Sequence, residues 1–227
     1  MIGGSTSYFS TPPVVSNSAP ALVQYSAATT ADGSAGLTVS FPVPVTAGNS
    51  VIAFISFDGT GDVVLSVSPH AIGGASLNEV ILNTDVPAAQ NGIYCLPVAA
   101  GGETGVGFTT TGAVRASMQI IEVSGLADAA AEDVSTNSGN SGTPSTGSVT
   151  PTSASNLVVA LAATADPDGF TAGFTEPPFT NVINVGASPV IQAMGYTIQS
   201  SATAQSPEAE LVNGGDWAAS AIALGAA

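Results

Sequence analysis

Positive charge is almost missing from this sequence of 227 residues. It contains no lysine, and Arg115 is its one strong base, against 16 aspartates and glutamates and a net charge of −15. A chain with this charge repels the phosphate backbone of nucleic acids and the headgroups of anionic lipids. We therefore expect neither nucleic acid nor a membrane among its partners.

Cysteine and histidine each occur only once. Because Cys95 is alone, the chain can form no internal disulfide and no zinc site built from cysteines. A Ser-His-Asp triad would have to use His70, which follows Pro69 in an expected loop, and no Gly-x-Ser-x-Gly elbow accompanies it. We therefore predict a protein that is not an enzyme and needs no cofactor.

Long apolar runs and export signals are also missing. No apolar run approaches the roughly 20 residues of a membrane helix. The first ten residues lack the basic and apolar regions of a secretory signal. Helical patterns are scarce as well, and Leu126 to Ala131 could form one turn at most.

Turn-forming and apolar residues are abundant instead. The chain contains 26 glycines and 15 prolines, and 44% of its residues are hydrophobic while only 7% are charged. Short apolar segments alternate with turns such as Ala31 to Ser34, Asn91-Gly92 and Gly101-Gly102. These features predict an all-β protein.

The segment from Arg115 to Leu126 has the pattern of a central strand, because both of its faces are apolar. Glu122 shares a face with Met118 and Ile120, so its carboxylate should be buried and needs a partner. Arg115 falls on the opposite face of the same strand. We therefore expect hydroxyls or backbone amides to donate hydrogen bonds to Glu122.

The two halves of the chain resemble each other. The segment around Asn49 matches that around Asn156 at an offset of 107 residues. Gln90 with Tyr94 matches Gln192 with Tyr196 at an offset of 102, and Arg115-Ala matches Trp217-Ala at the same offset. These matches predict pseudo-repeated halves, 21–126 and 130–227, each closing on a buried strand. Trp217 should lie in the core.

Residues 1–20 precede the predicted β-domain, 21–227, and read as an extended arm with Pro12-Pro13 and Pro20. Ordering such a segment costs backbone entropy that its few apolar groups cannot offset alone. The arm should therefore be an assembly element that docks on a neighbouring subunit as an added strand. Its larger apolar side chains are Ile2, Tyr8, Phe9, Val14 and Val15.

Two acidic loops could hold calcium, a cation that prefers clustered carboxylate and carbonyl oxygens. Asp58 and Asp62 flank one loop, and Asp166 and Asp168 lie in the other. Neither has EF-hand spacing, and Asp-Gly pairs are also ordinary turn residues, so both interpretations stay open.

A carboxylate pair, Glu208 and Glu210, lies on one face of a predicted strand. In a cleft, such a pair could hydrolyse glycosides. At an exposed edge it would be only a solvated surface.

Several segments carry a resemblance to a known group of proteins: 47–52, 93–94, 121–126, 156–159 and 217–219. The chain resembles jelly-roll-like β-sandwich modules of tailed-phage virion proteins and of bacterial surface proteins. The resemblance implies a sandwich that adheres, decorates or binds, and it carries over no catalytic residue.

The resemblance and the arm together lead to one functional expectation. We expect a non-enzymatic structural protein of a tailed-phage particle, either a capsid decoration or a tail-associated subunit. It would reside in the virion and contact copies of itself and other virion proteins. A bacterial surface protein would need an export signal and an anchor. Two alternatives stay open: a glycan-binding adhesion module, with or without calcium, and a glycosidase or esterase on a sandwich scaffold.

Overall fold

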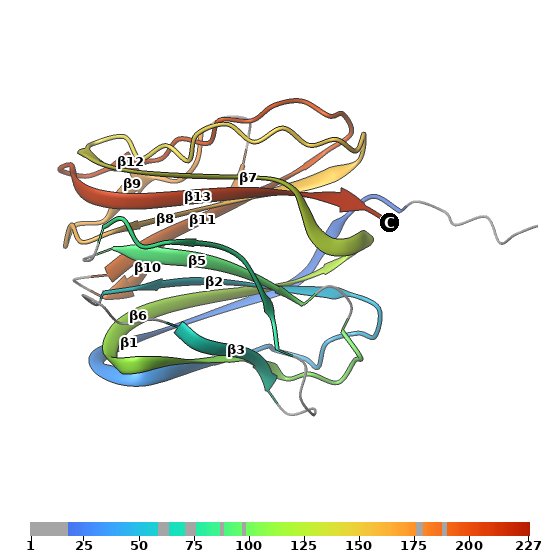
Figure 1. Ribbon diagram of the computed structural model, residues 1–227, viewed down its shortest axis with the longest axis horizontal. Helices are drawn as coiled ribbons and strands as arrows, with labels where there is room; N and C mark the ends of the chain where they lie inside the picture. The colour runs from blue at the N-terminus through green and yellow to red at the C-terminus, as the bar shows by residue number, and fades with distance from the viewer. Residues whose placement is uncertain are drawn as a thin grey trace, which may run out of the picture.

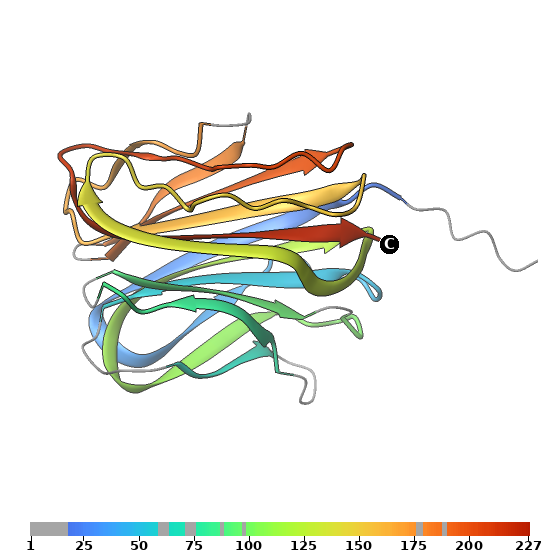
Figure 2. The ribbon, with the colours of Figure 1, turned by 45° about the horizontal axis from the view of Figure 1, so that its top comes forward.

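The computed structural model describes residues 18–58, 64–70, 76–86, 89–96, 99–175, 179–187 and 190–227. Within these ranges the chain forms β-strands and no helix. All of the strand pairs are antiparallel. The prediction of an all-β sandwich is confirmed, because two sheets stack face to face (Figures 1 and 2).

Each sheet is built from one half of the chain. The first sheet has the order β1-β6-β2-β5-β4, with β3 paired to β6, and the second has the order β10-β11-β8-β13-β7. The strands of the first sheet are β1 (Ala21–Ser40), β2 (Ser50–Phe57), β3 (Val64–His70), β4 (Asn78–Asn83), β5 (Gln90–Leu96) and β6 (Gly105–Ser124). Those of the second are β7 (Leu126–Ser141), β8 (Asn156–Thr164), β10 (Thr180–Ala187), β11 (Val190–Gln199) and β13 (Gly215–Ala226). A small ribbon pairs β9 (Phe170–Ala172) with β12 (Glu210–Leu211).

The two sheets have matching strand orders, as two pseudo-repeated halves would give. The order β1-β6-β2-β5-β4 matches β7-β13-β8-β11-β10, strand for strand in the order of the chain. The jelly-roll part of the prediction is not confirmed by this order, since each sheet takes all its strands from one half.

The pairing of the central strands corrects one of the two sequence offsets. Ile52 pairs with Ile121 in the first sheet, and Val159 pairs with Ile222 in the second, and all four side chains lie in the core between the sheets. The offsets are therefore 107 and 101 residues, so the offset of 102 is wrong by one. Because side chains alternate between faces, a shift of one residue would place an inward side chain on the outer face.

Three apolar cores hold the layers together. One lies between the sheets and contains side chains from both halves. The second lies under the first sheet, where the far ends of the bent strands β1 and β6 fold back together with β3 (Figure 1). The third lies over the second sheet, beneath the β9–β12 ribbon and neighbouring loops.

Four local predictions are wrong. The turn expected at Asn91-Gly92 lies inside strand β5, where both residues pair with β2. The turn expected at Ala31 to Ser34 is an irregular bend inside the continuous strand β1, where the register against β6 shifts. The segment from Leu126 to Ala131 opens strand β7 and is not a helical turn. His70 is the last residue of β3 and does not lie in a loop. The preceding Pro69 is tolerated there because, among the described residues, β3 pairs only with β6.

Both closing strands are central and buried, as predicted. In β6 the residues from Met118 to Val123 lie between β1 and β2, and in β13 the residues from Ala218 to Leu224 lie between β7 and β8. Trp217 is only 4% exposed and packs in the core over the second sheet. The described residues include no helix that could span a membrane.

Candidate binding groove

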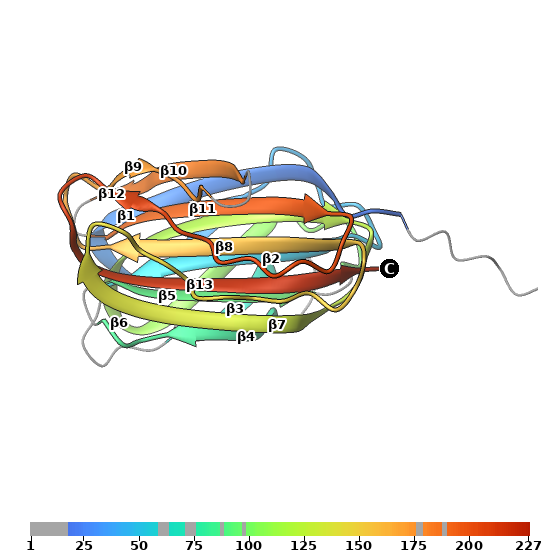
Figure 3. The same cartoon turned by 90° about the horizontal axis from the view of Figure 1, so that it is seen from above.

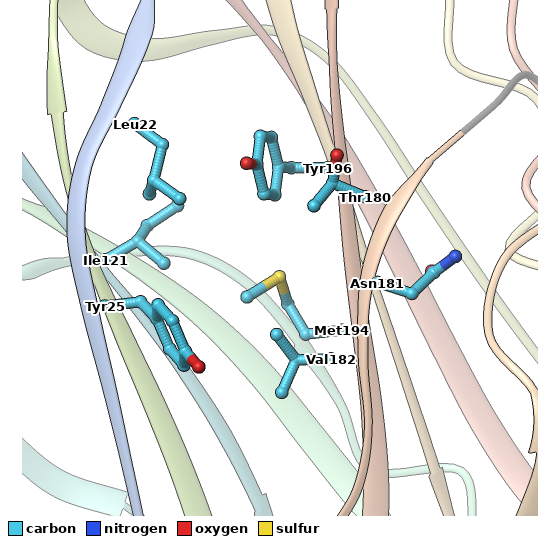
Figure 4. A pocket seen from close by; sticks show the side chains of 8 residues that line it. All are labelled: Leu22, Tyr25, Ile121, Thr180, Asn181, Val182, Met194 and Tyr196. Atoms are coloured by element: carbon cyan, nitrogen blue, oxygen red, sulfur yellow. The ribbon is translucent and has the colours of Figure 1, made fainter.

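A groove opens between strand β1 of the first sheet and strands β10 and β11 of the second. Strands β1 and β10 lie near each other along one side of the sandwich (Figure 3). The volume of the groove is about 260 Å³. Leu22, Tyr25 and Ile121 line it from the first sheet, and Thr180, Asn181, Val182, Met194 and Tyr196 line it from the second (Figure 4). The groove thus gives access to the edge of the core between the sheets.

A bulge in β1 shapes the first wall. Leu22 pairs with Val123 and Tyr25 pairs with Ile121, and the register shifts at Val23 between them. The extra residue lets Leu22 and Tyr25 both face the second sheet, although they are three positions apart. Because β1 is the edge strand, Tyr25 is 52% exposed.

Regular pairing of β10 with β11 forms the second wall. Thr180 pairs with Tyr196 and Val182 pairs with Met194, which places these side chains on the same face of the sheet. Asn181 points differently: its amide donates to the carbonyl of Phe174 at 3.0 Å, and its Oδ1 accepts from the amide of Phe174 at 2.9 Å. Asn181 therefore fixes the loop behind β10.

The lining decides what the groove can hold. It contains no charged side chain and is mainly apolar, and its polar side chains are those of Tyr25, Thr180, Asn181 and Tyr196. Pockets for whole small-molecule ligands usually measure about 300–1,000 Å³, which is larger than this one. The groove is therefore better suited to large apolar side chains of a peptide segment. Sequence reasoning missed it because its walls come from different halves of the chain.

Asp58, one of the predicted calcium ligands, interacts with the one arginine of the sequence. A carboxylate oxygen of Asp58 lies 3.5 Å from Nη1 of Arg115, and the Arg115 backbone amide donates to Asp58 Oδ1 at 2.7 Å. This pair joins the end of β2 to β6, although an exposed ion pair contributes little stability. Asp62 lies outside the described residues.

Asp166 and Asp168 form a hydrogen-bonded turn after β8. Asp166 Oδ1 accepts from the backbone amide of Asp168 at 2.9 Å, and Asp168 accepts from the side chain of Asn213. Nowhere in the described ranges do three or more His, Cys, Asp or Glu side chains gather as a metal site would require. Calcium binding by these loops stays a prediction.

The buried carboxylate of Glu122 is held by three donors. The backbone amide of Thr46 donates to it at 2.9 Å, and the side-chain amides of Asn49 and Gln24 each donate at 2.5 Å. The expectation of a backbone amide was correct. Sequence reasoning missed the two side-chain amides, because they are 73 and 98 residues from Glu122.

Glu208 and Glu210 are both exposed, on either side of the buried Ala209. Glu210 pairs with Ala172 in the ribbon, and the carbonyl of Glu208 accepts from the amide of Thr175 at 2.9 Å. The two carboxylates therefore lie on the solvated surface over the third core.

Cys95 should be chemically silent in the folded protein. Its side chain is fully buried, and this burial raises the pKa of the thiol to about 12. Since only the thiolate reacts readily, we expect a disulfide reagent at pH 8 to label native Cys95 at least ~100-fold more slowly than the unfolded chain. Absorbance of the released thiol measures both rates. Rapid stoichiometric labelling without denaturant would contradict the prediction.

The predicted assembly residues Ile2, Tyr8, Phe9, Val14 and Val15 lie outside the described residues. The described residues begin with Ser18, two positions before the buried Pro20 and four before the groove residue Leu22. Comparisons of the chain with protein-family models, curated proteins and solved structures found no match.

Proposed function

We propose that this chain is a non-enzymatic structural protein of a tailed-phage particle that assembles through its N-terminal arm, residues 1–20. The carrying observation is the uncharged groove beside the start of β1, close to where the arm joins the domain. The virion setting, as a capsid decoration or tail-associated subunit, rests on the sequence resemblance alone.

Charge supports a contact of this kind between copies. Two domains with a net charge near −15 repel each other, so a stable contact has to use uncharged apolar surfaces. The arm contains no charged side chain, and the groove lining contains none. An arm from one copy can therefore approach another copy without bringing further negative charge to it.

The layered core supports a scaffolding role. Three apolar cores fix both sheets and their covers, and the buried acid Glu122 is fully engaged in hydrogen bonds. A rigid domain of this kind loses little entropy when it is placed in a particle. The glycan-binding alternative is favoured by the exposed Tyr25, and binding to a glycan array that Tyr25→Ala abolishes would support it.

Assembly should depend on the arm and not on the fold. We expect the full chain to form a homo-oligomer. The variant Tyr8→Ser/Phe9→Ser should be a monomer, with a mass in light scattering near the 22.0 kDa of one chain. A chain that starts at Ser18 should also be a monomer in light scattering. It keeps Ser18 and Ala19, whose carbonyls lie close to Gly125.

The thermal unfolding midpoint provides the control. It should be nearly equal in the three proteins, because the changed residues precede the described domain. A full chain that is monomeric, or equal assembly by all three proteins, would show that the arm is not the assembly element.

A further inference from the structure

We propose that the groove between β1 and the β10–β11 hairpin binds the N-terminal arm of a second copy of this chain. The proposal rests on the proposed function, and it adds the place where the arm docks. Its basis is the combination of an open apolar groove, two available sheet edges and an uncharged apolar arm.

The two edges can hold an extended segment. Among the described residues, β1 pairs only with β6, and β10 pairs only with β11. Each strand therefore keeps one row of backbone groups that an incoming strand can use. Leu22, Tyr25 and Val182 stand beside these edges and face the space between the sheets (Figure 4). A docked segment would gain backbone hydrogen bonds and would bury apolar side chains.

The arm has the matching composition. Tyr8 and Phe9 provide two adjacent rings, and Val14 and Val15 provide two β-branched side chains. In an extended segment, successive side chains point to opposite sides, so one ring can enter the groove while the other covers its rim. Pro12-Pro13 restricts the free arm and so lowers the entropy lost on docking.

The direction of the chain before β1 favours docking of the arm on a second copy over docking on its own domain. Ala19 precedes Pro20 and is thereby restricted to extended backbone. The carbonyls of Ser18 and Ala19 lie so close to Gly125 that a Cβ there would be 2.8 and 2.9 Å away. Gly125 joins β6 to β7, the strand at the opposite edge of the second sheet from β10.

The chain thus leaves β1 on the side away from its own groove. The 17 residues before Ser18 can span at most about 60 Å when extended, which is enough to reach a neighbouring domain.

A cysteine pair tests the docking site in the full chain. Phe9→Cys is combined with Tyr25→Cys, and in parallel Val14→Cys with Tyr25→Cys, since either arm residue could lie next to the groove wall. After mild oxidation, we expect at least one pair to link most chains into covalent dimers or larger species on a non-reducing gel. Cys95 is fully buried and stays in place.

The matched control uses Val134 on β7, at the opposite edge of the second sheet. Val134 is 43% exposed, close to the 52% of Tyr25. The same arm cysteines with Val134→Cys should link less than a tenth as much. In light scattering, Tyr25→Glu should weaken assembly at least tenfold, whereas Val134→Glu should leave it unchanged. Thermal melts of both glutamate variants verify that they are folded.

The outcomes separate the two proposals. A disulfide that closes within one chain would place the arm in its own groove, and linking equal to the Val134 control would place it elsewhere. Either result overturns the groove proposal. If Tyr8→Ser/Phe9→Ser still abolishes assembly in that case, the arm-mediated function stands without this site. If those arm substitutions change nothing, both proposals fail.

Discussion

Replacing Trp217 by alanine should lower the free energy of unfolding by about 3–5 kcal/mol, the usual cost of truncating a buried aromatic side chain. The indole is 4% exposed and fills the core between the second sheet and its cover. Its Nε1 donates to Ser141 Oγ at 3.0 Å. The ring also lies against Gly139 on the paired strand, where a Cβ would come within 2.7 Å of it. Gly139 has no side chain that could fill the space left by the ring.

Urea unfolding followed by circular dichroism measures this effect. Val212→Ala is a suitable control, because Val212 is 44% exposed and its truncation should change stability by less than about 0.5 kcal/mol. Trp217→Phe should cost less than Trp217→Ala, since it keeps an aromatic ring and loses the indole hydrogen bond. If Trp217→Ala unfolds at the same urea concentration as the parent, the indole belongs to a binding surface and the glycan alternative gains support.

The faces of the central strands could be predicted because they depend on local alternation. Met118 and Ile120 lie in the core under the first sheet, while Ile121 and Val123 lie in the core between the sheets. A period of two residues determines this division without reference to other strands. Trp217 could be predicted as a core residue for another local reason, because the small residues around it in the sequence leave space for one large ring.

Bends and registers could not be predicted in the same way. The strands β1 and β6 continue through segments that look like turns, because pairing along both strands compensates for the irregular residues. Leu126 to Ala131 is short and rich in alanine, and its pairing with β13 overrides its local preference. Such pairings join residues far apart in the chain, and the sequence contains no local signal for them.

The corrected repeat explains a polar layer inside the sandwich. With offsets of 107 and 101, Asn91 corresponds to Gln192 and Gln119 corresponds to Ser220. Ser220 Oγ lies 2.6 Å from Asn91 Oδ1 and donates to it across the sheets. The corresponding pair of the other half is Gln119 and Gln192, and both are fully buried. The repeat thus places polar residues at equivalent positions in the core.

Glu122→Gln should destabilise the protein by about 2–3 kcal/mol. The carboxylate is 1% exposed, and its two oxygens accept three hydrogen bonds from Gln24, Thr46 and Asn49. A glutamine side chain has the same shape, but it replaces one acceptor oxygen by a donor. It also removes the charge that strengthens the remaining bonds. The loop before β2 and the edge strand β1 would both lose part of their attachment to the central strand β6.

Glu208→Gln makes the same chemical change at an exposed side chain and should shift stability by less than about 0.5 kcal/mol. A double-mutant cycle with Asn49→Ala should give a coupling energy above about 1 kcal/mol, because Asn49 donates directly to Glu122. Equal unfolding midpoints for Glu122→Gln and Glu208→Gln would contradict the prediction. Because Gln24 lies next to Tyr25, loosening β1 should also disturb the groove wall. Glu122→Gln should therefore weaken assembly at temperatures at which the protein is still folded.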